Sequence, residues 1–448
     1  MMRKGRVARL MRLGGMATGL AGDVAGAASH RLTRSADKVT SEIHERAARR
    51  MLRVLGEMKG LPLKAGQMLS YIDEMIPPEH RHVYNEVLGQ LQTHTPPMEW
   101  DDVQELFAEE FDGREPDEVF GSFDHEPIAA ASIGQVYRAT LHDGTPVVVK
   151  VQYPGVDKAF DSDLANLDVL VSAMSAVMRK TDFGLLVGDI VRRVKEECDY
   201  TVEAENQRTF RQLWRDDPEV IVPRTIDELC THRVLVSEYL DGLEWSRMLE
   251  TADTDLRCQY GTVIFRFVFT SLLVHGVFNG DPHPGNYLFY PDGRVAFIDY
   301  GCVQRYSPEQ AVAFGELRSA LADGTADREF GRLVHRVLPI PEDLDEEMET
   351  RAVAYLQKSF EPITGPQPYR YTRDYSASLL REGLEVKNFM TGKLLRGKKA
   401  YPIDLEQGDG GFAFLGRIVF GLSSILATLD TEADFRAMVG EMGSASRP

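Results

Sequence analysis

The sequence predicts an α+β fold with two lobes, in which a strand-rich part precedes a helix-rich part. Three observations lead to this expectation. The 448 residues are about three times the usual size of one domain, so two or more packed units are expected. Runs rich in β-forming residues lie between residues 122 and 151, whereas helical patterns dominate from residue 250 onward. Hydrophobic residues make up 43% and charged residues 27%, so we expect disorder only at the ends.

The first part of the chain is basic, although the whole chain is acidic. Residues 1–35 carry seven basic residues and one acid, a net charge of +6, which leaves about −24 for the rest of a chain with a formal charge of −18. The acidic charge of the chain beyond residue 35 argues against nucleic-acid binding, and the basic N-terminal segment fits an anionic membrane surface. An apolar stripe at helical spacing follows, formed by Leu10, Leu13, Ala17, Leu20 and Val24. It predicts either a surface-lying amphipathic helix or, because Gly14, Gly15 and Gly19 weaken it, a frayed or internally docked tail.

Cysteine spacing and hydropathy define the expected compartment. Cys198, Cys230, Cys258 and Cys302 are widely spaced and form no CxxC pair, so neither a zinc site nor a disulfide framework is indicated. No stretch of 18 uncharged apolar residues exists, which predicts no transmembrane helix. The nearest candidate, residues 412–429, contains Arg417 and is interpreted as a buried C-terminal core helix. We expect a cytoplasmic protein, with peripheral attachment to the inner face of a membrane as an option.

The order of elements follows from periodicity and turn residues. Residues 136–141 and 146–151 flank Asp143-Gly144 and predict a β-hairpin. Residues 157–215 read as helical, residues 234–240 as a strand, and residues 286–297 as two short strands around Pro291-Asp292-Gly293. The expected domains are a basic segment (1–40), a helical extension (41–115), a strand-rich lobe with a helical insertion (116–240) and a helical lobe (241–448).

The hairpin follows a loop of small residues. Small side chains let backbone N–H groups approach phosphates closely. Gly134 and Val136 match the kinase loop G-x-G-x-x-G-x-V, while alanines replace its first two glycines. The residues expected to contact a nucleotide here are Ala129, Ala130, Ala131, Ser132, Gly134 and Val136. The alternative interpretation is an alanine-rich turn without a ligand.

A lysine at the end of the second hairpin strand continues the pattern. Lys150 ends the run Val147-Val148-Val149-Lys150, which parallels V-A-I-K, where the lysine pairs with the α- and β-phosphates. A solvated strand edge is the alternative. Glu197, on a predicted helix, is the expected acidic partner of Lys150, and Glu196 and Glu203 are its rivals. We also expect Glu238 and Tyr239 to contact the nucleotide.

The most specific pattern lies further along the chain. In H-R-D-L-x-x-x-N the asparagine follows the aspartate by five residues, as Asn286 follows Asp281, and Asp299-Tyr300-Gly301 stands where D-F-G would stand. Asp281 can orient or deprotonate an attacking hydroxyl or water, and Asn286 and Asp299 supply oxygen ligands for Mg²⁺. The usual His-Arg is missing, so the loop must be held differently. His283 lies between two prolines and is interpreted as shaping the loop.

These motifs together resemble the UbiB family of atypical kinases, which is linked to ubiquinone biosynthesis. The resemblance covers about residues 40 to 435 and includes Lys64-Ala65-Gly66-Gln67, which matches the family's K-x-G-Q motif. It implies a two-lobed protein-kinase-like fold whose N-terminal helical extension packs over the active site, with Lys64 and Gln67 facing the nucleotide pocket. It also implies ATP or ADP and Mg²⁺ as cofactors, and an anionic membrane, a quinone-like lipid or a quinone-biosynthesis complex as partner.

Three functions remain open at this point. The first is a UbiB-type ATPase that supports isoprenoid-quinone or lipid metabolism. The second is a small-molecule phosphotransferase, because residues 280–286 also resemble the catalytic loop of aminoglycoside- and choline-kinase-like enzymes. The third is a non-catalytic lipid-binding assembly scaffold. The K-x-G-Q motif argues against the second function, and the complete set of Lys150, Asp281, Asn286 and Asp299 argues against the third.

Overall fold

The computed structural model describes residues 98–131, 133–155, 198–326, 329–332, 336, 346–395 and 421–443. Segment 1–40, most of the expected helical extension, and the predicted site residues Lys64, Gln67, Ser132 and Glu197 lie outside these ranges. Backbone contacts divide the chain into two compact units. Unit 1 comprises residues 1–200 and 231–236, and unit 2 comprises residues 201–230 and 237–448. The mixture of helices and sheets confirms the predicted α+β class.

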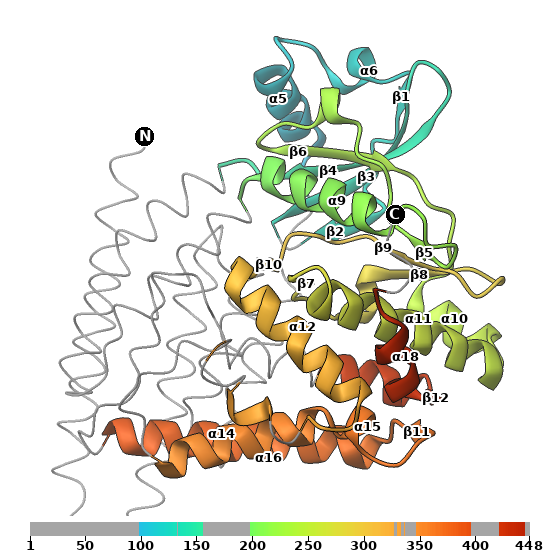
Figure 1. Cartoon of the computed structure of the whole chain (residues 1–448). Coiled ribbons are helices and arrows are strands. Elements are labelled where there is room, and N and C mark those ends of the chain that lie inside the picture. Colours follow the sequence, from blue (N-terminus) through green and yellow to red (C-terminus); the bar gives the residue numbers. More distant parts are fainter. Residues whose placement is uncertain are drawn as a thin grey trace, which may run out of the picture. The chain divides into compact units, whose positions relative to one another are not determined.

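Unit 1 is built on a five-stranded sheet in the order β1-β3-β4-β6, with β2 added alongside β3 (Figure 1). Its elements are α5 (Trp100–Glu110), α6 (Pro116–Val119), β1 (Ser122–Phe123), β2 (Ala129–Ala131), β3 (Gly134–Thr140), β4 (Pro146–Gln152) and β6 (Val234–Glu238), whose last two residues belong to unit 2. The β1–β3, β2–β3 and β3–β4 pairs are antiparallel.

The predicted hairpin is confirmed as β3 and β4. Its turn is closed by the Asp143 side chain, which accepts from the Thr145 N–H at 2.9 Å, and by Gly144, whose φ of 88° favours glycine. Alternate residues of both strands are buried, as a half-buried strand requires. The buried Tyr137 packs on Phe123 with ring centroids 5.2 Å apart, so aromatic side chains from β1 and the helices cover this face.

Unit 2 is mostly helical, as predicted for the chain beyond residue 250. Its helices are α9 (Tyr200–Trp214, of which Tyr200 belongs to unit 1), α10 (Trp245–Thr251), α11 (Thr254–Leu273), α12 (Pro308–Ala322), α14 (Glu346–Ser359), α15 (Glu361–Thr364), α16 (Arg373–Leu395) and α18 (Phe435–Glu441), with 3₁₀ turns η2 (Asp227–Leu229) and η3 (Pro284–Asn286). The core surrounds α11, and α14 lies beside α16 (Figure 1).

Three small sheets complete unit 2. They join β5 (Val220–Ile221) with β9 (Val295–Phe297) and β8 (Tyr287–Phe289), β7 (Val277–Asn279) with β10 (Val303–Arg305), and β11 (Tyr369–Arg370) with β12 (Glu432–Ala433). The β8–β9 hairpin confirms the two short strands predicted around residues 291–293, and its turn contains Gly293 at φ 91°. This hairpin and the β7–β10 pair flank the loop that carries Asp281.

The apolar C-terminal segment is described in part. Residues 421–428 are helical, and Leu422, Leu426 and Leu429 are buried in the core of unit 2, as predicted for a core helix. Within the described part of the chain, the structure contains no helix that is both long and apolar enough to span a membrane.

Candidate functional site

The three alanines predicted to contact a nucleotide, Ala129–Ala131, form a strand, β2, rather than the open loop expected from the kinase pattern, and Gly134 and Val136 lie in β3. Ala129 pairs with Val136, and Val136 in turn pairs with Lys150 across β3 and β4. Residues directly opposite each other on antiparallel strands project from the same face. Ala129, Val136 and Lys150 therefore form one row across three strands of unit 1, on the face opposite the buried Tyr137.

Gly134 is required by the packing of the strands. A Cβ at this position would clash with the Val151 carbonyl oxygen and would lie 2.8 Å from its carbonyl carbon and 3.0 Å from the Tyr200 hydroxyl. Two of these atoms are backbone, which cannot rotate away. Gly134 was predicted because a small residue lets the backbone approach phosphates. The structure shows that it is also needed for β3 and β4 to pack closely beside Lys150.

Lys150 lies next to an aromatic ring at the start of α9. Its Nζ is 5.1 Å from the centroid of Tyr200, within the range of a cation–π interaction. The Tyr200 N–H donates to the His232 carbonyl at 3.0 Å, and the buried Gln152 donates to the Cys198 carbonyl at 2.6 Å. The chain entering α9 is therefore fastened to the end of β4, two residues beyond Lys150. The predicted pairing of Lys150 with Glu197 remains a prediction, because Glu197 is not among the described residues.

Glu238 is the last residue of β6 and Tyr239 follows it, and both are half-buried. The Glu238 carboxylate accepts from the Arg224 N–H at 3.2 Å, and the Glu238 N–H donates to the Arg224 carbonyl at 2.8 Å. This segment of unit 2 is thereby held to the chain before η2. Contact with a nucleotide here remains a prediction.

The loop from Asp281 to Asn286 is held by its own side chains. The Asn286 Nδ2 donates to the Asp281 carbonyl at 2.9 Å and to Asp281 Oδ2 at 3.3 Å. Because the amide nitrogen is used in this way, the Asn286 Oδ1 is the atom left for a cation. His283 accepts from the Gly285 N–H through Nδ1 at 3.1 Å, the loop-shaping role expected for it.

Asn279 holds the Asp281 loop in place, although the sequence lacks the His-Arg pair that usually precedes the catalytic aspartate. Its Oδ1 accepts from the Asp281 N–H at 3.4 Å, and its Nδ2 donates to the Asp299 carbonyl at 2.7 Å. The β7–β10 pair supports this link, since the Gly280 N–H donates to the Cys302 carbonyl at 2.7 Å. One side chain thus connects the Asp281 loop to the Asp299 segment. Sequence reasoning missed Asn279, although its position two residues before the aspartate was visible.

Glu203, a rival acid in the sequence analysis, lies beside this segment. It is buried, with 6% of its surface exposed. A Cβ at Gly301 would lie 3.5 Å from Glu203 Oε2 and 3.6 Å from Asp299 Oδ1, so the two oxygens are no further apart than the sum of these distances. The Gly301 N–H donates to Asp299 Oδ1 at 3.1 Å, which orients that carboxylate. Unit 2 therefore brings Asp281, Asn286 and Asp299 together, with Glu203 beside Asp299.

Two buried tyrosines border the acidic loops. Burial, reinforced by the Asp281 charge, raises the pKa of Tyr287, and burial together with the Asp299 charge raises the pKa of Tyr300 well above its ordinary value. Both phenols therefore stay protonated at neutral pH. The Tyr300 hydroxyl donates to the Phe297 carbonyl at 3.0 Å, a structural use that leaves no phenolate for chemistry.

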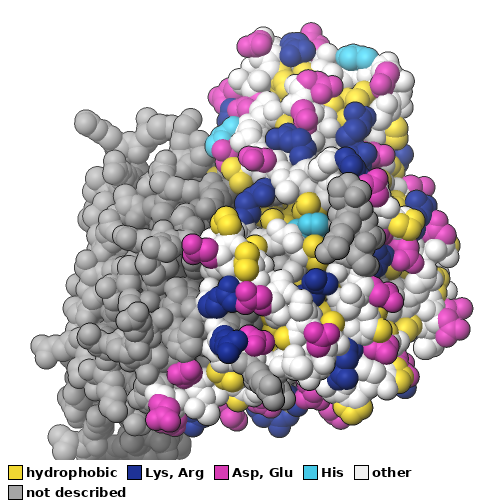
Figure 2. Space-filling view, in the orientation of Figure 1, with side chains coloured by type: hydrophobic (Ala, Val, Ile, Leu, Met, Phe, Trp, Pro, Cys, Tyr) yellow, Lys and Arg dark blue, Asp and Glu magenta, His cyan; other side chains and the backbone are white. Residues whose placement is uncertain are grey.

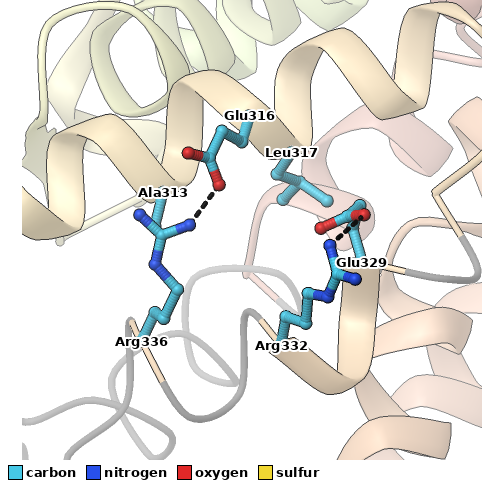
Figure 3. Close-up of a pocket in the computed structure, with 6 residues that line it drawn as sticks. All are labelled: Ala313, Glu316, Leu317, Glu329, Arg332 and Arg336. Atoms are coloured by element: carbon cyan, nitrogen blue, oxygen red, sulfur yellow. Dashed lines mark hydrogen bonds and ion pairs between the residues drawn. The ribbon is translucent and has the colours of Figure 1, made fainter.

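One depression on the described surface lies apart from the predicted site residues. The depression, beside α12, is lined by Ala313, Glu316, Leu317, Glu329, Arg332 and Arg336 (Figure 3). Both of its arginines are paired with its glutamates, and none of the predicted site residues lines it. On the face in Figure 2, acidic and basic side chains of the described residues are interspersed. Among these residues, no three His, Cys, Asp or Glu side chains are grouped so as to hold a metal ion by themselves.

Comparison with known proteins identifies the family. Residues 90–328, more than half of the chain, match the model of the ABC1 atypical kinase-like domain. The chain therefore belongs to this family of atypical kinases, which confirms the predicted UbiB resemblance.

Several relatives are similar over much of the chain. The protein slr0889 of Synechocystis is 33% identical over 295 residues, which cover 62% of this chain and 70% of that protein. The atypical kinase COQ8B of rat mitochondria is 33% identical over 333 residues, covering 72% and 61%. The chloroplast protein ACTIVITY OF BC1 COMPLEX KINASE 1 of Arabidopsis is 35% identical over 262 residues, covering 57% and 38%. The matched segments thus span between 38% and 70% of the length of these relatives.

A solved structure is similar over nearly the whole chain. It is the complex of Rv3197 with erythromycin from Mycobacterium tuberculosis, with a TM-score of 0.60 and 28% sequence identity. The likeness covers 92% of this chain and all of that one.

Proposed function

We propose that this chain is a UbiB-type ATPase that binds ATP or ADP with Mg²⁺, hydrolyses ATP, and supports isoprenoid-quinone or membrane-lipid metabolism. The observation that carries the proposal is the assembly of Asp281, Asn286 and Asp299 in unit 2 through Asn279. Family membership supports the nucleotide, and the donor set supports the metal.

The donor set fits Mg²⁺ in particular. This ion takes oxygen ligands, usually one or two carboxylates together with phosphate oxygens and waters. The Asp299 carboxylate, oriented by the Gly301 N–H, and the Asn286 Oδ1 would supply the protein ligands. Such a site is completed by the nucleotide, which agrees with the lack of a larger metal cluster among the described residues. Bound Mg²⁺ would neutralise charge on the phosphates.

The other residues have distinct proposed roles. Lys150, in the row with Ala129 and Val136, would contact the phosphates, and Glu197 would hold it in place. Asp281 would orient or deprotonate the attacking water, because its carboxylate is fixed by the Asn286 amide. The K-x-G-Q residues would face the nucleotide pocket and exclude protein substrates.

The likeness to the Rv3197–erythromycin complex favours a second candidate function. Since that likeness covers nearly the whole chain, we propose macrolide binding as an additional property to be tested directly. Phosphoryl transfer to a small molecule also remains an alternative to hydrolysis. The same assays separate these possibilities.

The test is phosphate release from ATP and Mg²⁺, measured with and without anionic liposomes and with and without erythromycin. Asp281→Asn should keep nucleotide binding and lower turnover by about 100-fold or more, as loss of a positioned base does. Asp292→Asn is the matched control, because Asp292 lies in the exposed β8–β9 turn and bonds only to Arg294 among the described residues. Equal turnover in the wild type and Asp281→Asn would refute the role of Asp281. A phosphorylated small molecule in place of free phosphate would favour the transferase.

A further inference from the structure

Helix α9 buries three polar side chains on neighbouring turns. Glu203, Asn206 and Gln207 are 6%, 8% and 2% exposed. A buried amide without hydrogen bonds destabilises the fold, so the partners of these groups indicate what the helix holds. Gln207 donates to the Pro223 carbonyl at 2.8 Å and to Ser237 Oγ at 3.1 Å. Asn206 turns to a different part of unit 2.

Both ends of the Asn206 amide are used. Its Nδ2 donates to the Tyr300 carbonyl at 3.1 Å, and its Oδ1 accepts from Arg305 Nη2 at 3.0 Å. The same Arg305 nitrogen donates to Thr209 Oγ1 at 3.2 Å. Arg305 therefore fixes which way the amide faces, so that the Asn206 nitrogen is directed at Tyr300.

The Tyr300 carbonyl is one of two consecutive carbonyls held by asparagines. Asn279, from β7, donates to the Asp299 carbonyl at 2.7 Å, and Asn206, from α9, donates to the next carbonyl along the chain. The Tyr300 ring is fully buried and lies 5.1 Å from Phe210, one helical turn beyond Asn206. The backbone around Asp299 is thus held by side chains from two separate elements, β7 and α9. Helix α9 contacts both the backbone and the side chain of Tyr300, the residue after Asp299.

We propose that Asn206, oriented by Arg305, is a positioning residue that sets the Asp299 carboxylate for the cation. This inference rests on the proposed function. Mg²⁺ demands nearly ideal octahedral geometry, so a small rotation of the Asp299 segment weakens its binding. A residue that only stabilised α9 would change the melting temperature and leave the cation requirement unchanged.

The variants separate the donor from the acceptor of the amide. Asn206→Ala removes both hydrogen bonds. Asn206→Asp keeps an acceptor for Arg305, but places a carboxylate oxygen where the donor to the Tyr300 carbonyl was. Gln207→Ala is the matched control, because it removes a more deeply buried amide from the next position of the same helix and has no bond to the Asp299 segment.

The main readout is the Mg²⁺ concentration that gives half of the thermal shift produced by saturating ADP. Both Asn206 variants should raise this concentration by about 10-fold or more, whereas Gln207→Ala should lower the melting temperature and leave the midpoint within about twofold. Hydrogen exchange of residues 298–305 without ligand should accelerate in Asn206→Ala and not in Gln207→Ala.

Each outcome decides between the claims. Unchanged Mg²⁺ midpoints in both Asn206 variants, with a normal response in the wild type, overturn the positioning role. Recovery of the wild-type midpoint in Asn206→Asp would show that the bond to Arg305, and not the donor to Tyr300, matters, and would equally overturn it. A wild type that gives no Mg²⁺-dependent shift refutes the proposed function itself, and with it the role toward the cation.

Discussion

Replacing Gly134 with alanine tests whether this glycine serves strand packing or phosphate approach. The added methyl group would collide with the Val151 carbonyl group and lie 3.0 Å from the Tyr200 hydroxyl. Strands β3 and β4 must separate at this end, where the Tyr153 N–H donates to the Ile133 carbonyl at 2.9 Å. Lys150 lies opposite Val136 two residues away, so its position would change as well.

The expected loss of stability follows from two contributions. Overpacking a well-packed site costs about 1–3 kcal/mol. Loss of one backbone hydrogen bond at the end of the hairpin adds about 1 kcal/mol. A total of roughly 2–4 kcal/mol corresponds to a decrease of about 5–15 °C in the melting temperature of a unit of this size.

The assay is thermal unfolding without ligand, followed by titration with ADP and Mg²⁺. Gly144→Asn is the control at the other end of the same hairpin. Gly144 has a φ of 88°, and a Cβ there would meet no atom within 4 Å, so asparagine, which tolerates positive φ, should change the melting temperature little. An unchanged melting temperature of Gly134→Ala, combined with weaker ADP binding, would refute the packing argument and assign Gly134 to the phosphates alone.

Four further outcomes are expected. Asp299→Asn should abolish Mg²⁺-dependent ADP binding in calorimetry, because it removes a charged metal ligand; undiminished binding would exclude Asp299 as a ligand. Gly421→Val should lower turnover by roughly 10- to 100-fold with ADP binding retained. Even a Cβ at this position would lie 2.7 Å from Pro282 Cγ, so the larger side chain should displace the loop next to Asp281. Burial lowers the pKa of His275 below its ordinary 6.5, so the folded state binds fewer protons and stability falls as the pH drops below that value. The melting temperature should therefore fall less between pH 7.5 and 5.5 in His275→Gln than in the wild type. An equal fall in both proteins would show that His275 does not cause this loss of stability. Deleting residues 1–30 should release the protein from anionic liposomes in sedimentation, as high salt should, and unchanged sedimentation would place the lipid contact elsewhere.

Local patterns predicted the local structure well. The hairpins around Asp143-Gly144 and Pro291-Asp292-Gly293 were predicted because strand alternation and turn glycines act over a few residues. The loop-shaping role of His283 followed in the same way from its neighbouring prolines. The spacing of Asp281, Asn286 and Asp299 likewise indicated residues that unit 2 brings together, because a short hairpin separates them.

Contacts between distant segments could not be predicted from one sequence. The run Ala129–Ala131 was expected to be a loop because it aligns with the glycine-rich loop of kinases, whereas pairing with β3 makes it a strand. Asn206 contacts Tyr300 over a separation of 94 residues, and no periodicity reports such a bond. The sequence did offer one signal for the role of Asn206. It lies three residues after Glu203, so both polar side chains lie on the same face of α9.

The path of the chain between the two units has a consequence for synthesis on the ribosome. The sheet of unit 1 takes β6 from a segment that follows residues 201–230 of unit 2. Domains generally fold as units while the chain emerges, starting from the N-terminus. Strand β4 pairs with β3 on one side, but its other edge cannot pair with β6 until residue 236 has emerged, and by then α9 is already outside. A nascent chain that stalls after α9 would expose the unpaired edge of β4, a template for aggregation, so this stretch of translation is where we expect the protein to depend most on chaperones.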